Sequence, residues 1–152
     1  MTHVCIERPD QADVRALIDE LDAYQRPLYP PESHHGIDIE ALLQPGVIFA
    51  VARDGDGAAL GCGAMVVEDR WGELKRMFVR PAARGRGVAQ ALLVFLEARA
   101  RERGVAAARL ETGVSQPEAL RFYERAGYVR RGPFAHYADD PLSVFMEKPL
   151  VP

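Results

Sequence analysis

The chain has few cysteines and no long apolar run, and both absences narrow its class. Only Cys5 and Cys62 occur among its 152 residues, so neither a disulfide framework nor a cysteine metal knuckle is expected. Both lie in apolar, strand-like runs, which favours buried free thiols over a catalytic nucleophile. No apolar run approaches the ~18 residues that span a membrane, and the N-terminus lacks a signal-peptide core. We therefore expect a cytoplasmic location and no membrane partner.

A basic excess is also missing. Nineteen Lys and Arg residues stand against 22 Asp and Glu residues, for a net charge of -3, which argues against a nucleic acid partner. The composition, 48% hydrophobic and 27% charged, is that of a globular protein of one domain. Basic residues nevertheless gather within residues 75–86, where they form either a solvated surface or a local anion site: Lys75, Arg76, Arg80, Arg84 and Arg86.

Hydrophobic periodicity predicts a mixed α/β fold in the order βα(α)βββαβαββ. Three consecutive strands in the middle imply an antiparallel meander. Ser115 and Glu118 have the spacing of a capping box for the last helix. The expected strands are Val4–Glu7, Val47–Ala52, Ala58–Glu68, Trp71–Val79, Ala107–Thr112, Tyr128–Arg130 and Ser143–Lys148, and the expected helices Gln11–Tyr24, Ile37–Leu43, Val88–Arg103 and Pro117–Ala126.

A glycine-rich loop, Arg84-Gly85-Arg86-Gly87-Val88-Ala89, joins an expected strand to an expected helix. Free N–H groups and the positive end of the helix dipole would favour a phosphate there. A dinucleotide fingerprint fits less well, because Gln90 replaces its third glycine and the loop follows an antiparallel meander. There is no Walker lysine pattern, which disfavours a nucleoside-triphosphate enzyme. A glycine turn without any ligand remains an alternative.

A second motif, Gln116-Pro-Glu-Ala119-Leu-Arg-Phe122-Tyr123-Glu-Arg-Ala-Gly-Tyr128, follows about thirty residues later. With it the chain resembles the GNAT superfamily of acyl-CoA-dependent N-acyltransferases. Arg84-x-x-Gly87-x-Ala89 is similar to that family's pyrophosphate motif, (Q/R)-x-x-G-x-(G/A), and the later motif to its tyrosine followed by Gly-(Phe/Tyr). The resemblance covers almost the whole chain, and the C-terminal segment resembles a small bacterial subgroup whose substrates are often unassigned.

The resemblance implies one domain over residues 1–152 with the GNAT fold: a mixed sheet, an antiparallel N-terminal meander, splayed fourth and fifth strands, and four helices. It implies acetyl-CoA as co-substrate and no metal. A backbone N–H of Met77 or Phe78, at a bulge, would polarise the thioester carbonyl. The family often has asparagine where Gln116 stands. The implied cofactor contacts are Met77, Phe78, Val79, Arg84, Gly85, Arg86, Gly87, Val88, Ala89, Gln116, Ala119 and Phe122.

Two residues take the family's proton-transfer positions. Tyr123 stands at the general-acid position, where it would protonate the departing thiolate; its alternative role is a core aromatic. Glu73 matches the base of one branch, while other members use ordered water. Glu73 could equally be a surface carboxylate paired with Lys75. Strand alternation places Glu73, Lys75 and Met77 on one face unless a bulge shifts it.

The acceptor is expected to be a primary amine of a small molecule or peptide. The loop between the first two helices often builds this pocket in the family, so Tyr29, His34 and His35 are candidates, with His136 in the loop before the last strand. The resemblance also makes a homodimer through the last strands an expectation. A non-catalytic acyl-CoA sensor is the alternative function, and dinucleotide-dependent oxidoreduction is disfavoured by the element order.

Overall fold

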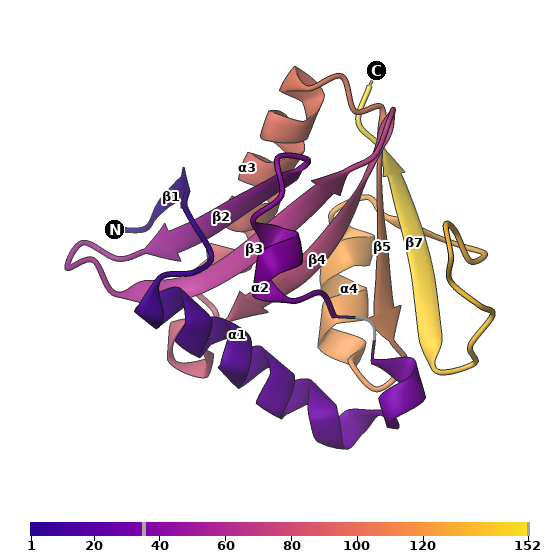
Figure 1. Cartoon of the computed structure of the whole chain (residues 1–152), viewed down its shortest axis with the longest axis horizontal. Coiled ribbons are helices and arrows are strands. Elements are labelled where there is room, and N and C mark those ends of the chain that lie inside the picture. The colour runs from indigo at the N-terminus through magenta and orange to yellow at the C-terminus, as the bar shows by residue number, and fades with distance from the viewer. Residues whose placement is uncertain (35, 152) are drawn as a thin grey trace.

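The computed structural model describes residues 1–34 and 36–151. Within them one sheet has the strand order β1-β2-β3-β4-β5-β7-β6 (Figure 1). Four α-helices and three short 3-10 helices connect its strands. The strands are β1 (His3–Ile6), β2 (Val47–Arg53), β3 (Ala59–Val67), β4 (Trp71–Val79), β5 (Ala107–Gly113), β6 (Val129–Arg131) and β7 (Ser143–Pro149), and the helices α1 (Ala12–Gln25), η1 (Arg26–Leu28), η2 (Pro31–Ser33), α2 (Ile39–Leu42), η3 (Pro81–Ala83), α3 (Val88–Glu102) and α4 (Pro117–Arg125).

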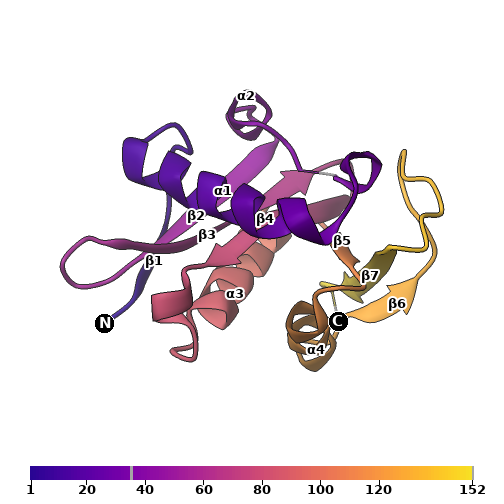
Figure 2. The same ribbon diagram turned by 90° about the horizontal axis from the view of Figure 1, so that it is seen from below.

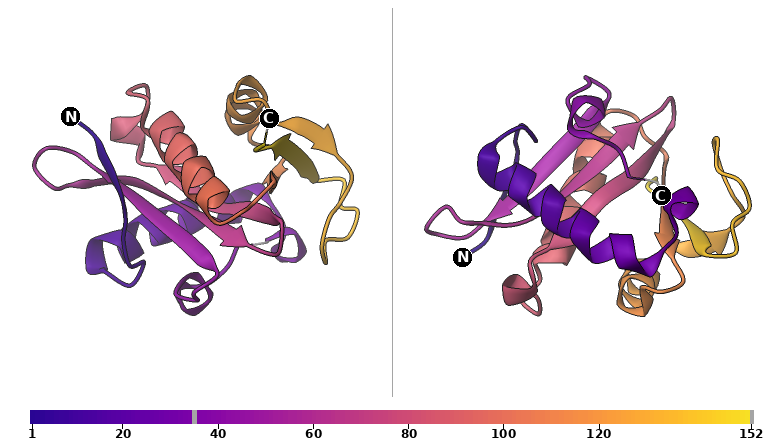
Figure 3. Two further views of the ribbon diagram at one scale, coloured as in Figure 1. Left: turned by 90° about the horizontal axis from the view of Figure 1, so that it is seen from above. Right: turned by 60° about the horizontal axis from the view of Figure 1, so that its bottom comes forward.

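Helices cover both faces of the mixed sheet that the sequence predicts (Figure 2). Strands β1 to β4 form the antiparallel meander, β4 and β5 are parallel, and β5, β7 and β6 are antiparallel. Helices α1 and α2 lie on one face and α3 and α4 on the other (Figures 2 and 3). Each face has its own apolar core, one around Leu17 and Phe49 under α1 and one around Leu92 and Leu96 of α3. The sheet is thus buried on both faces, and its register shifts at two places among the described residues, between Ala52 and Arg53 and between Cys62 and Ala64.

Strands β4 and β5 separate halfway along their length. Their pairing runs from Trp71 opposite Ala107 to Leu74 opposite Leu110 and then stops. Beyond that point β4 stays with β3 and β5 stays with β7. In Figure 1 the two ribbons diverge, and α4 is visible behind the gap. The backbone edges that face each other across the gap are therefore open to a ligand.

A β-bulge in β4 accompanies the separation. The register with β3 shifts between Cys62 and Ala64, so that Arg76 and Met77 together oppose Gly63. Arg76 has a left-handed φ of 58°, which a non-glycine residue adopts only when other contacts hold it. Its guanidinium donates to the carboxylate of Asp22 at 2.5 Å and to the carbonyl of Ile37 at 2.9 Å. Side-chain contacts with α1 and with the segment before α2 thus maintain the bulge.

The bulge changes which residues share a face. Met77 and Leu74 both pack against the core under α3, whereas Lys75 pairs with Glu73 on the other side of the strand. Simple alternation, which puts Met77 with Glu73 and Lys75, is wrong beyond Lys75 because the bulge inserts one extra residue. Gly63 accommodates this, since a Cβ there would lie 2.3 Å from Met77 Sδ and 3.0 Å from Leu96.

Two further expectations are corrected. Cys5 is exposed because β1 is an edge strand, while Cys62 is buried as predicted. Helix α4 begins after Gln116 and has no side-chain cap, so the capping box of Ser115 and Glu118 does not form.

Across the described chain, none of the helices has the length and apolar character needed to cross a membrane.

Candidate active site

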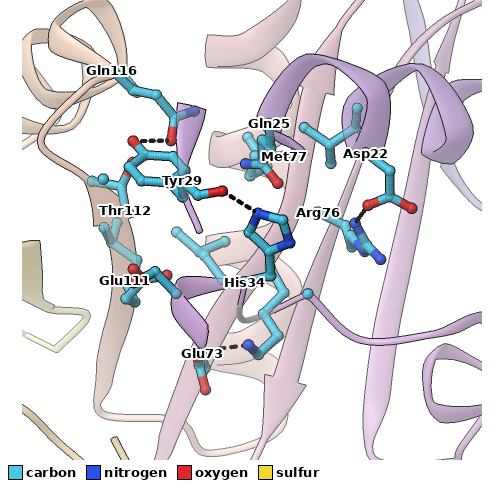
Figure 4. Close-up of a pocket in the computed structure, with 18 of the residues that line it drawn as sticks. Asp22, Gln25, Tyr29, His34, Glu73, Arg76, Met77, Glu111, Thr112 and Gln116 are labelled. Carbon is cyan, nitrogen blue, oxygen red and sulfur yellow. Dashed lines mark hydrogen bonds and ion pairs between the residues drawn. The ribbon is translucent and has the colours of Figure 1, made fainter. Parts of the chain in front are cut away.

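A cavity of about 270 Å³ lies where β4 and β5 separate. One wall comes from α1 and the segment that follows it, the opposite wall from β5 and α4, and the base from β4 (Figure 4). Polar and charged side chains dominate the lining, in contrast to the two apolar cores. The residues that carry the argument below are Asp22, Arg26, Tyr29, His34, Glu73, Lys75, Arg76, Met77, Glu111, Gln116, Ala119 and Tyr123.

Tyr123 combines both roles expected for it. Its ring packs edge-to-face against Phe122 at 5.2 Å and Tyr128 at 5.7 Å between centroids, so it is a core aromatic. It also lines the cavity. Burial raises the pKa of its hydroxyl well above the usual value. Within residues 1–34 and 36–151 no side chain or carbonyl hydrogen-bonds this hydroxyl. Tyr123 therefore presents a protonated, unengaged O–H to the cavity.

Glu73 is buried and held in a closed cluster. Its carboxylate accepts the hydroxyl proton of Tyr137 at 2.5 Å and lies 3.3 Å from Lys75 Nζ. Lys75 in turn donates to the Tyr137 hydroxyl at 2.7 Å. Burial, together with the neighbouring Glu73 carboxylate, raises the pKa of Tyr137. Pairing with Lys75 is thus confirmed, but Glu73 is 6% exposed and is not a surface residue.

A second carboxylate in the cavity, Glu111, was not among the residues predicted from the sequence. It lies on β5, and its only direct partner in the described chain is the hydroxyl of Ser143, which donates to it at 2.8 Å. Burial raises the pKa of Glu111 to about 7 despite that hydrogen bond. A lone acidic residue inside the apolar strand 107–112 was the signal available in the sequence. Glu111 can exchange a proton near neutral pH.

Replacing Glu111 by glutamine is expected to stabilise the fold at alkaline pH. Its pKa is raised on folding, so its favourable contribution is complete below about 4.5 and is lost as the pH rises through about 7. The gap corresponds to about 3 kcal/mol. Urea unfolding should therefore show Glu111→Gln matching wild type near pH 4.5 and exceeding it by about 2–3 kcal/mol at pH 8.5.

Glu147 is the matched control for this measurement. Burial opposes its ionisation, but hydrogen bonds from Arg109 and Arg131 hold its pKa below the usual value. Its stabilisation is therefore present above its ordinary pKa, and Glu147→Gln should lose stability at pH 8.5. Equal curves for wild type and Glu111→Gln at both pH values would contradict a raised pKa at Glu111.

The residues expected to bind the acceptor divide into two groups. Tyr29 and His34 line the cavity and contact each other, since His34 Nε2 lies 2.9 Å from the Tyr29 carbonyl oxygen. The Tyr29 hydroxyl donates to Gln116 Oε1 at 3.0 Å and closes the wall beside α4. His136 instead stacks on the outside of Tyr137 and does not line the cavity. His35 lies outside the described residues.

A second cavity, of about 280 Å³, lies at the glycine loop. Its lining includes Arg84, Gly85, Gly87 and Ala89. The N–H groups of residues 85–90 donate to no backbone carbonyl of the described chain, because the first helical bond runs from Ala91 N–H to the Gly87 carbonyl. Gly85 and Gly87 both have positive φ, which turns these groups outward. The loop thus offers a row of free donors at the start of α3.

The remaining predicted cofactor residues are divided between the two cavities, except for Phe78 and Arg86. Met77, Gln116 and Ala119 line the first, whereas Val79, Val88 and Phe122 line the second. The side chain of Phe78 is buried in the core under α1 and lines neither. Arg86 is exposed, is absent from both linings, and donates to the Ala82 carbonyl at 3.4 Å.

No group of three or more His, Cys, Asp or Glu side chains suited to a metal ion occurs among the described residues. The thiol of Cys62 lies 3.4 Å from the Arg76 carbonyl oxygen, and burial raises its pKa to about 12. It is therefore a neutral thiol packed in the core.

An opened β4–β5 edge, a row of free N–H groups and a protonated tyrosine define the class of protein as an acyl-CoA-dependent N-acyltransferase. Residues 14–128 match the family described as Acetyltransferase (GNAT) family. The chain belongs to this family. It is an N-acetyltransferase.

Similar proteins cover nearly the whole of the chain. The chain is 48% identical over 146 residues to an IAA acetyltransferase of Azospirillum brasilense, with 95% of each chain covered. It is 36% identical to the uncharacterized N-acetyltransferase YsnE of Bacillus subtilis, covering 97% of this chain and 99% of that protein. Among solved structures, a putative acyl-CoA N-acyltransferase from Klebsiella pneumoniae matches with a TM-score of 0.85 and 41% identity over 99% of both chains.

Proposed function

We propose that residues 1–152 act as one catalytic domain that binds acetyl-CoA across both cavities and transfers its acetyl group to a primary amine. The pyrophosphate would accept hydrogen bonds from the loop 84–89, and the pantetheine arm would follow the open edge of β4 at residues 77–79. The observation that carries this proposal is that neighbouring residues of β4 and α4 line the two cavities: Met77 and Tyr123 line the first, and Val79 and Phe122 line the second.

The transfer would take place by direct attack. The amine nitrogen bonds to the thioester carbonyl carbon, the carbon–sulfur bond breaks, and a backbone N–H of Met77 or Phe78 stabilises the developing oxyanion. Glu111 takes the proton that the amine loses, because no side chain within residues 1–34 and 36–151 forms an ion pair with its carboxylate. Tyr123 gives its proton to the departing CoA thiolate. Glu73 is the alternative base, although Lys75 and Tyr137 already engage it.

The test of the proposal is CoA release from acetyl-CoA in the presence of a panel of primary amines. Amine-dependent release, with the acetylated amine identified by mass spectrometry, is the expected result. A protein that binds acetyl-CoA but releases no CoA with any amine would instead be a sensor of acyl-CoA. A thermal shift with NAD(H) and none with acetyl-CoA would contradict the assigned donor.

Substitution of Gly87 by alanine is expected to weaken acetyl-CoA binding by about tenfold or more, because a charge-assisted hydrogen bond at the loop is misaligned. Gly57 is the matched control: it has φ of 86° against 76° for Gly87, and a Cβ at either position meets nothing within 4 Å. Both variants therefore carry a similar backbone strain. Calorimetric titration with acetyl-CoA should show the loss for Gly87→Ala alone, and an equal loss in both variants would refute the loop as the phosphate site.

The proposal also covers the binding partners, the cellular location and the oligomeric state of the protein. The acceptor is a small molecule or peptide and the protein binds no nucleic acid, in keeping with the net charge of -3. We propose a cytoplasmic location, where acetyl-CoA is available. A homodimer joined through the β6 edge of the sheet, where Val129 is 67% exposed, is part of the same proposal; light scattering of the purified protein tests it.

A further inference from the structure

The charges that line the first cavity are nearly all paired with one another. Arg76 is bound to Asp22 at 2.5 Å, with its Nε on the Ile37 carbonyl. Lys75 is bound to Glu73 at 3.3 Å. Within each pair the cation neutralises the carboxylate, so neither pair carries a net charge that would attract a ligand. The charged residues of the lining are Asp22, Glu73, Glu111, Arg26, Lys75 and Arg76.

One carboxylate and one guanidinium remain. Glu111 accepts a hydrogen bond from the neutral hydroxyl of Ser143, and no Lys, Arg or His of the described chain makes an ion pair with it, although the charges of Lys75, Glu73 and Asp140 act on it from neighbouring elements. Arg26, at the start of η1, is exposed at the opposite wall and has no ion-pair or hydrogen-bond partner in residues 1–34 and 36–151. The cavity therefore presents one free negative group on β5 and one free positive group at its rim.

We propose, on the basis of the function proposed above, that the acceptor is a zwitterion: a primary amine that also carries a carboxylate, as in a free amino acid. The ammonium group would enter opposite Glu111, lose its proton to that carboxylate and attack the thioester. The carboxylate of the acceptor would pair with the Arg26 guanidinium, which can donate two parallel hydrogen bonds to the two carboxylate oxygens.

The same charges select against multiply cationic amines. A polyamine would bring a further ammonium group toward the Arg26 guanidinium, which has no ion pair, while the carboxylates of Asp22 and Glu73 are already occupied. Unpaired like charges across a binding surface lower affinity for the wrong ligand. Spermidine should therefore be a poor acceptor.

The experiment compares matched acceptors that differ only in the carboxylate: β-alanine with β-alaninamide, and L-alanine with L-alaninamide. Spermidine is added as the polyamine acceptor. With saturating acetyl-CoA, wild type should use at least one acid about tenfold better than its amide in kcat/KM, mainly through KM. Arg26→Gln should abolish the preference, and Arg26→Glu should reverse it in favour of the amide. Arg15→Gln, in the preceding helix α1 and outside the cavity, is the control and should keep the wild-type preference.

The outcomes separate this proposal from the function on which it rests. If wild type acetylates amides or spermidine with the same kcat/KM as the acids, the proposal of a zwitterionic acceptor is refuted, while the acetyltransferase activity stands. A preference for acids that persists in Arg26→Glu would refute the role of Arg26. Absence of CoA release with every amine, despite acetyl-CoA binding, would overturn both.

Discussion

Replacing Glu111 by glutamine is expected to lower kcat/KM for the acceptor by about 10²–10⁴-fold, the range of a lost general base. The amide keeps the size of the side chain and can still contact Ser143, but it cannot take the amine proton. In wild type the rate should rise with pH through about 7, as Glu111 loses its proton. The variant should lack this rise and retain only the titration of the amine itself. Steady-state rates between pH 5.5 and 9 check both expectations.

Glu73→Gln is the matched control, since both carboxylates line the cavity. It removes the negative charge that Lys75 and the Tyr137 hydroxyl contact, and it should lower stability while preserving the rise near pH 7. The groups that influence Glu111 from neighbouring elements are Ser143 of β7, Lys75 and Glu73 of β4, and Asp140 of the preceding loop. If Glu73→Gln loses the rise and Glu111→Gln keeps it, Glu73 is the base.

The second large effect is expected for Tyr123→Phe. Its kcat should fall by about 10²-fold or more, while acetyl-CoA binding is retained. Phenylalanine preserves the packing against Phe122 and Tyr128 and removes only the proton donor. Because burial raises the pKa of Tyr123, the wild-type hydroxyl stays protonated, and the wild-type rate should not decline as the pH approaches 10. Single-turnover kinetics measure the chemical step directly.

The neighbouring Tyr128 provides a control in the same aromatic cluster. Its hydroxyl donates to Glu97 at 2.8 Å and is absent from both cavities. Tyr128→Phe should therefore lower the midpoint of thermal unfolding and leave kcat near the wild-type value. Full turnover by Tyr123→Phe across the pH range would exclude Tyr123 as the acid.

The sequence predicted those features that arise from local patterns. The order of elements, the meander and the position of the glycine loop follow from hydrophobic periodicity and from turn residues, and the structure confirms them. The family motifs led to Tyr123, which lines the cavity as expected. Strand boundaries differ by one or two residues because ladder ends depend on the partner strand.

The rest depends on contacts between distant segments. Nothing local in β4 shows that Arg76 adopts a positive φ, since Asp22 and Ile37 hold it from far away in the chain. The environment of Glu111 likewise depends on Ser143, and the engagement of Glu73 on Tyr137. Cys5 is exposed because β1 ends the sheet, which composition cannot reveal.

The anchoring of Arg76 has a consequence for any effort to change the acceptor range by engineering. One side chain fixes the bulge, α1 and the segment before α2 relative to one another, so the width of the gap between β4 and β5 is coupled to the placement of α1. Substitutions in α1 that disturb Asp22 would shift the β4 backbone at the bulge along with the cavity wall that α1 forms. Another part of the wall lines the cavity without holding the bulge and can be diversified without releasing Arg76: Gln25, Arg26, Tyr29, Ser33 and His34.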